Sequence, residues 1–170
     1  MKKLILLIGA AIVCLGSIQA QRLAYMDSEY ILNKIPEYKR AQESLDKVAA
    51  DWQKDIETKM KDIELLYQKF QAEQPLLTEK MKEERISQIE AKEKEIKEYQ
   101  KLKFSPNGEL FKKRQELIQP IQDRIYDEVQ KIAKMKTYDI VFDKSSGATM
   151  IYVNPKLNIS DEIIKGIGIQ

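Results

Sequence analysis

Few side chains in this sequence have the chemistry of a catalytic or metal site. Histidine is absent from the 170 residues, and the only cysteine is Cys14. These counts exclude a Ser-His-Asp or Cys-His catalytic unit, a His-ligated zinc site, an internal disulfide and a CxxC redox pair. Asp139 and Asp143 lie near one predicted strand. Nothing around them indicates a tuned acid pair, so we interpret them as strand-edge or turn residues.

Phosphate-binding motifs are also missing, because the chain contains neither GxxxxGK[ST] nor GxGxxG. The densest basic cluster is Lys112, Lys113 and Arg114. We interpret it as a solvated helix face, with contact to lipid headgroups or lipopolysaccharide phosphates as the alternative. The prediction is a protein that is not an enzyme and that needs no cofactor and no metal.

Residues 1–20 have the three-part layout of a secretory signal peptide. Lys2 and Lys3 provide the positive start, residues 4–15 form an almost unbroken apolar run, and Ala20 is the small residue before Gln21. This layout predicts cleavage between Ala20 and Gln21. The processed protein is then expected to be soluble beyond the inner membrane.

Two other interpretations of this leader remain open. One is a buried or membrane-anchoring helix, although the run over 4–15 is short beside the roughly 20 residues of a bilayer span. The other is a lipoprotein anchor at Cys14, where Val13 stands in place of the expected small residue. Taking Lys2 and Lys3 from the 29 basic residues leaves 27, equal to the 27 acidic ones, so the processed chain is neutral.

The processed chain begins with a short apolar run that predicts a strand over residues 22–26. Asp27 and Ser28 follow as possible N-caps of a short helix to about Ile35. Pro36 interrupts this helix and favours an extended Ile35. We assign residues 21–36 to the N-terminal part of a small body.

The C-terminal part changes to the period of strands. Residues 138–142 and 149–153 are apolar runs on either side of the turn residues 144–147, so they are predicted to pair as a β-hairpin. Ser160 is predicted to open a last short helix, which Gly166 ends. Residues 137–170 therefore complete the predicted body.

Between these ends the sequence predicts long charged helices. From Glu37 to Gln74 there is no Gly and no Pro, and apolar residues recur at a mean spacing near the helical period of 3.6. The stripe consists of Leu45, Val48, Trp52, Ile56, Met60, Ile63, Tyr67 and Phe70. Pro75 ends the first helix. Residues 37–136 thus predict a helical hairpin with its tip near 74–78.

The returning part of the hairpin is expected to be interrupted. The sequence Ser105-Pro106-Asn107-Gly108 predicts a break or kink, and Pro120 predicts a second kink. The fold class is therefore α+β and mostly α, a long antiparallel helical hairpin on a small β body. Three short strands and one short helix form a small core for 150 residues, with open sheet edges.

The small core predicts an obligate oligomer that buries apolar residues of the body. Spacing and composition do not reveal the number of copies. The residues expected at this contact are Leu23, Tyr25, Tyr138, Ile140, Phe142, Ile151, Tyr152 and Val153.

The order of these segments resembles the Skp family, also called OmpH-like, of periplasmic chaperones for outer-membrane proteins. The most specific parts are residues 23–28 and the segment Tyr138-Asp139-Ile140-Val141-Phe142-Asp143 with the strand after it, and residues 158–163 also match. The resemblance covers essentially the whole chain. It implies a periplasmic homotrimer with three helical tentacles around a cavity. Unfolded outer-membrane proteins, the clients, would be held there without ATP.

The resemblance also implies partners: other copies of this chain and unfolded outer-membrane proteins, with no nucleic acid. Several apolar residues of the hairpin are interpreted as packing within it, with client contact as the alternative: Trp52, Met60, Tyr67, Phe70 and Met81. The neutral charge of the processed chain indicates only weak long-range attraction to lipid or lipopolysaccharide. A coiled-coil spacer or envelope scaffold without clients is the competing function.

Overall fold

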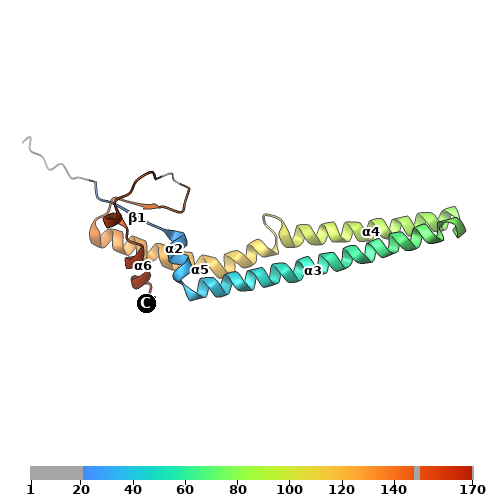
Figure 1. The fold of residues 1–170 in the computed structure, drawn as a ribbon, viewed down its shortest axis with the longest axis horizontal. Helices are drawn as coiled ribbons and strands as arrows, with labels where there is room; N and C mark the ends of the chain where they lie inside the picture. Colours follow the sequence, from blue (N-terminus) through green and yellow to red (C-terminus); the bar gives the residue numbers. More distant parts are fainter. Residues whose placement is uncertain (1–20, 148–149, 170) are drawn as a thin grey trace, which may run out of the picture. The chain divides into compact units, whose positions relative to one another are not determined.

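The structure is a computed structural model that describes residues 21–147 and 150–169. The predicted signal peptide, with Ala20, and Thr149 of the predicted hairpin lie outside these residues. The chain divides into two units (Figure 1). The first unit, called the body, contains residues up to Ile31 and from Asp127 onward, and the second, called the arm, contains Leu32–Tyr126.

The arm is built on two long helices that lie side by side, α3 (Pro36–Glu73) and α4 (Glu79–Phe104) (Figure 1). Helix α3 starts where Ile35 is held extended before Pro36, which suits the first helical position because it has no N–H to leave unpaired. The short 3-10 helix η1 (Gln74–Leu76) and the N-cap Thr78, whose hydroxyl accepts from the Met81 N–H, form the turn between them.

Two clusters of buried side chains hold the arm together. One, called the hairpin core, consists of Ile56, Ile63, Ile89 and Ile96 between α3 and α4. The other joins Ala41 and Leu45 of α3 to Ile118 of α5 (Glu109–Lys136). Each cluster is formed by side chains from one face of each helix, so the other faces of the helices remain exposed to water.

A sharp break separates α4 from α5 at residues 105–108, as predicted. Gly108 lies so close to the end of α4 that a Cβ atom there would be 2.8 Å from the carbonyl oxygen of Leu102 and 2.9 Å from that of Lys103. Its N–H donates to the Ser105 carbonyl at 2.8 Å. Only glycine fits this turn without moving backbone atoms. Helix α5, by contrast, continues through Pro120 as one helix.

Replacing Gly108 by alanine is therefore expected to destabilise the arm by about 1–3 kcal/mol, because the clash is with backbone rather than with a side chain that can turn away. Urea unfolding followed by circular dichroism measures the change. Asn107→Ala is the matched control and is expected to alter the unfolding free energy by less than about 0.5 kcal/mol. Equal effects of the two substitutions would contradict this account of the turn.

The described residues of the body contain one sheet, made of two strands. Strand β1 (Leu23–Met26) pairs in parallel with β2 (Ile140–Asp143), with Leu23 opposite Ile140 and Met26 opposite Asp143. The predicted β-hairpin is therefore wrong for the single chain. Residues 150–153 lie outside the strands, and the strand that pairs with β2 is the first strand of the chain.

Short helices and the end of α5 contribute to the body beside the sheet. Helix α2 (Ser28–Lys34) follows β1, and α6 (Ser160–Gly166) follows the 3-10 helix η2 (Pro155–Leu157). Helix α6 contacts the last part of α5, where Lys136 forms an ion pair with Glu162. The side chains buried in the body are Ala24, Ile31, Ile132, Ile159, Ser160, Ile163 and Ile164.

The boundaries of the two units differ from the predicted divisions at residues 36 and 136. They fall within α2 and within α5, so the last residues of α5 belong to the body. Among the described residues, no helix combines the length and the apolar character that a bilayer span requires.

Candidate functional site

The body carries an apolar hollow of about 520 Å³. Leu23 and Tyr25 of β1 and Phe142 of β2 line one part of it. The segment after the turn supplies another part, including Ile151 and Tyr152, which are 97% and 84% exposed. Large apolar side chains this exposed in one hollow mark a surface for binding another molecule.

Six of the eight residues predicted for the oligomer contact line this hollow. They are Leu23, Tyr25, Phe142, Ile151, Tyr152 and Val153. The other two, Tyr138 and Ile140, do not line it. Ile140 is exposed on β2, and the Tyr138 ring lies 5.8 Å from the guanidinium of Arg22.

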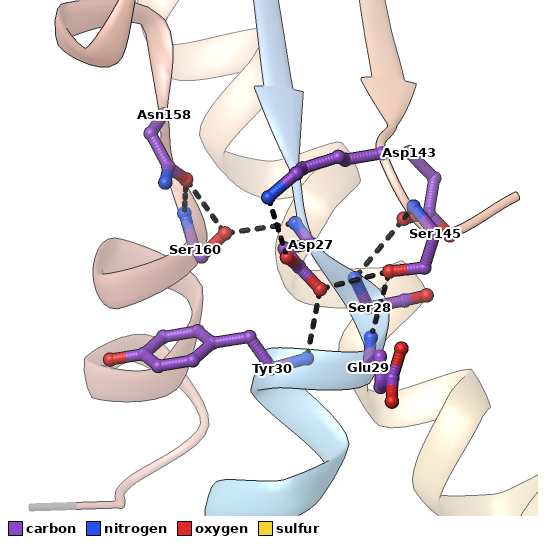
Figure 2. Close-up of polar contacts among 9 residues, drawn as sticks. Asp27, Ser28, Glu29, Tyr30, Asp143, Ser145, Asn158 and Ser160 are labelled. Carbon is purple, nitrogen blue, oxygen red and sulfur yellow. Dashed lines mark hydrogen bonds and ion pairs between the residues drawn. The ribbon is translucent and has the colours of Figure 1, made fainter. Parts of the chain in front are cut away.

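A polar junction centred on Asp27 fixes the ends of both strands (Figure 2). The Asp27 carboxylate accepts from the backbone N–H of Tyr30 at 2.9 Å and from the hydroxyl of Ser145 at 2.8 Å. Its own N–H donates to the Ser160 hydroxyl, whose O–H in turn donates to the Asn158 side chain. The junction therefore joins the start of α2, the turn after β2 and the start of α6.

The two aspartates considered for acid–base chemistry also bind backbone. Asp143 accepts from the N–H groups of Ser28 at 3.1 Å and Ser145 at 3.0 Å (Figure 2). Asp139 accepts from the N–H of Arg22 at 2.7 Å. Both are therefore the strand-edge and turn residues that we predicted, and each one holds a strand end in place.

The pKa of Asp27 lies below its usual value, mainly because the Tyr30 N–H and then the Ser145 hydroxyl bind the charged form, with help from Lys144. A lowered pKa means that these contacts stabilise the fold above the unfolded-state value of about 3.9 and are lost as the pH falls through the folded-state value. As the N-cap of α2, Asp27 also satisfies an otherwise unpaired helix N–H.

Asp27→Ala is expected to lower the free energy of unfolding at pH 7 by about 1–2 kcal/mol. The difference between the variant and the unsubstituted protein should shrink as the pH falls below about 3.9, because the carboxylate becomes protonated in both the folded and the unfolded states. Urea titrations at several pH values measure this difference in the free energy of unfolding. Glu43→Ala, on the exposed surface of α3, is the control. A pH-independent difference would show that the charge of Asp27 does not matter.

The structure separates the five apolar arm residues that the sequence grouped together, of which Met81 lies on α4 and the others on α3. Phe70 packs against the hairpin core, and Trp52 contacts Phe104 edge to face with ring centroids 6.1 Å apart. Met60 and Tyr67, however, are 56% and 42% exposed, and Met81 is also exposed. Phe70 and Trp52 therefore pack within the hairpin, whereas Met60, Tyr67 and Met81 leave apolar surface exposed.

The sequence did not predict the cluster that surrounds Lys103, next to the break between α4 and α5. The Lys103 ammonium lies 4.6 Å from the ring centroid of Trp52 and 5.3 Å from that of Tyr99, and it pairs with Glu109. Aromatic faces attract a cation, so the cluster stabilises the end of α4 next to α3. Because this stretch contains many lysines, its sequence does not distinguish Lys103 as the one that contacts the aromatic rings.

The basic cluster Lys112, Lys113 and Arg114 is exposed on α5. The part of the chain that the structure describes holds no group of three or more acidic or cysteine side chains placed to bind a metal ion.

Comparisons with known proteins indicate one family. The sequence model of the family described as outer membrane protein (OmpH-like) matches residues 22–167. An uncharacterized protein of Aquifex aeolicus is 32% identical over 142 residues, which cover 84% of this chain and 83% of that protein. The chaperone protein Skp of Vibrio cholerae is 26% identical over 167 residues, 96% of this chain and 93% of that protein.

A solved structure supports the fold. An OmpH-like protein of Caulobacter crescentus, solved as a candidate outer membrane chaperone, superposes with a TM-score of 0.68 over 89% of this chain and 86% of its own. Its sequence is only 10% identical, so the likeness concerns the fold alone. It confirms the predicted fold class, a long helical hairpin with a small strand region. With the family match over nearly the whole described chain, this chain belongs to the OmpH-like family.

Proposed function

We propose that this protein is an ATP-independent holdase, which binds unfolded outer-membrane β-barrel proteins and prevents their aggregation. The observation that carries the proposal is that the arm exposes large apolar side chains along its length rather than in one deep pocket. They include Met60, Leu65, Tyr67, Leu76, Met81, Ile86 and Leu102. Weak contacts at many places suit a client that must be held and then released. The family membership and the Skp relative support the same function.

We further propose that three copies assemble through the apolar hollow of the body. Ile151 and Tyr152 are almost fully exposed in the single chain, beside the short β1–β2 sheet. Association would cover these side chains and the sheet edges at once. The resemblance to the family supports three copies, with the arms enclosing the client.

The proposed place of action is the periplasm, after removal of residues 1–20. No ATP is required, which agrees with a sequence that lacks a phosphate-binding loop. Contact of Lys112, Lys113 and Arg114 with lipid or lipopolysaccharide is proposed to be weak, because the processed chain has no net charge to attract anionic surfaces from a distance.

Light scattering tests the holdase function. An outer-membrane β-barrel protein is diluted from urea with and without the purified protein, and the mass of the protein is measured in the same sample. Suppression of scattering near one trimer per client is the expected result. A folded oligomer that leaves the scattering unchanged would instead favour the spacer or scaffold function, since both functions require the same helical arm.

A further inference from the structure

The two faces of the α3–α4 hairpin differ in chemistry, and the buried pair Ile63 and Ile96 separates them. On one face these two residues border a hollow of only about 70 Å³, whose other lining residues are Lys59, Asp62, Lys92 and Glu95. We call this the paired face. Its Lys59 ammonium lies 3.0 Å from a Glu95 carboxylate oxygen.

An aromatic residue also contacts the charged groups of the paired face. The Tyr99 ring centroid lies 5.9 Å from the Lys59 ammonium, and the Tyr99 hydroxyl donates to Asp55 at 3.2 Å. An apolar ligand on this face would have to displace water from these charged groups or break their contacts. Burying a charge without its partner costs free energy, so the paired face disfavours an apolar ligand.

The opposite face is open. It has two neighbouring hollows, of about 280 and about 560 Å³, and both are lined by Met60 and Ile63. Gln100 of α4 completes the first hollow and Tyr67 of α3 the second. We call this the open face. Its largest apolar groups, Met60 and Tyr67, are about half exposed. The Tyr67 hydroxyl donates to Glu93 across the hairpin at 3.1 Å, but among the described residues no ion pair joins the charged groups that line the two hollows.

The charges around the open face have both signs. Glu57, Lys61 and Glu64 line the larger hollow, and Glu93 and Lys97 line the smaller one. Such a rim does not complement a strongly charged segment of either sign. It complements a segment that is nearly neutral and carries apolar side chains with polar groups between them.

We propose that the open face is the client-binding face of the arm, and that it receives an extended segment of an unfolded outer-membrane β-barrel protein. This inference rests on the proposed holdase function. Barrel strands alternate apolar and polar residues, so every second side chain points to the same side of the segment. Two successive apolar side chains would occupy the hollows on either side of Met60, whose flexible thioether adapts to different shapes.

Cross-linking at four exposed positions tests the assignment. Met60→Cys and Gln100→Cys place a thiol-linked photo-cross-linker on the open face, whereas Asp62→Cys and Lys92→Cys place it on the paired face as matched controls. Cys14 lies in the predicted signal peptide, so the introduced thiol is the only one in the processed protein. Each variant is irradiated with a β-barrel protein diluted from urea.

The expected result is a cross-linking yield at positions 60 and 100 that exceeds the yield at 62 and 92 by about fivefold or more. A difference of this size corresponds to a clear difference in client affinity between the two faces. Equal yields, or higher yields on the paired face, would overturn the inference. Cross-links between copies of this chain without client would also overturn it, because a second copy would then cover the open face.

The scattering assay separates this inference from the holdase function. If the unsubstituted protein suppresses aggregation while the yields are equal, only the assignment of the face fails. If it does not suppress aggregation, the proposed function fails and the assignment fails with it.

A binding measurement provides a second test that does not depend on the cross-linker. Met60→Ser with Tyr67→Ser is expected to raise the client Kd about tenfold, because two half-exposed apolar groups are lost from the contact. Lys59→Ser with Glu95→Ser, on the paired face, is expected to leave the Kd within about twofold. Circular dichroism verifies that both proteins remain helical. A larger effect of the control pair would contradict the proposal.

Discussion

Replacing Ile151 and Tyr152 together by lysine is expected to convert the assembled protein into single chains. Each of these side chains is almost fully exposed in one copy and lines the apolar hollow of the body. Covering a large apolar side chain stabilises an interface by about 1.5–3 kcal/mol, and a trimer would cover six of them. Two lysines per copy would instead bring ammonium groups into an apolar contact, where an unpaired charge is strongly unfavourable.

Size-exclusion chromatography with light scattering measures the outcome as a mass of one chain instead of the proposed three. Met135→Lys is the matched control, because Met135 is an exposed apolar residue of the body that does not line the hollow. It should leave the mass unchanged. If the double variant still has the mass of the unsubstituted protein, another surface joins the copies. Far-ultraviolet circular dichroism verifies that the variant retains its helices.

Ile56→Ala is expected to destabilise the arm by about 2–5 kcal/mol, the range found when buried isoleucine or leucine is cut to alanine. Ile56 is 1% exposed, and the hairpin core contains only three other buried residues, so few neighbours can move in to fill the cavity. A loss of this size is a large part of the 5–15 kcal/mol that stabilises most domains.

Urea unfolding tests this prediction, followed by circular dichroism and by the fluorescence of Trp52, the only tryptophan in the chain. Leu65→Ala is the control, since Leu65 lies on the same helix but is 61% exposed. It is expected to change the unfolding free energy by less than about 0.5 kcal/mol. Similar midpoints for the two variants would mean that the arm is not stabilised by its narrow apolar core.

Local spacing was sufficient to predict the helical arm. Ile56 and Ile63 recur with the period of a helix in a stretch without Gly or Pro, and both are buried in α3. The same spacing could not separate Phe70, which is packed, from Met60 and Tyr67, which are exposed. All three belong to the same stripe, and the direction from which α4 approaches decides which of them it covers.

The strands were harder to predict, because pairing depends on residues far apart in the sequence. The turn at 144–147 has the composition of a hairpin turn, and this suggested pairing between its two flanks. In the structure Ser145 and Lys144 bind Asp27 instead. These contacts hold the turn beside the end of β1, so that β1 pairs with β2 in parallel. No local pattern reveals a contact between the two ends of a chain.

The parallel strand pair also determines when the body can form. Arg22 and Asp139, which meet at the start of the sheet, are 117 positions apart, whereas α3 and α4 meet across a short turn. Local contacts form quickly and distant ones slowly, because a long loop must first be closed. A ribosome makes β1 early, but β1 has no neighbour until β2 has been made. The apolar hollow is lined by residues from Leu23 to Leu157, so it can form only after these distant segments have come together.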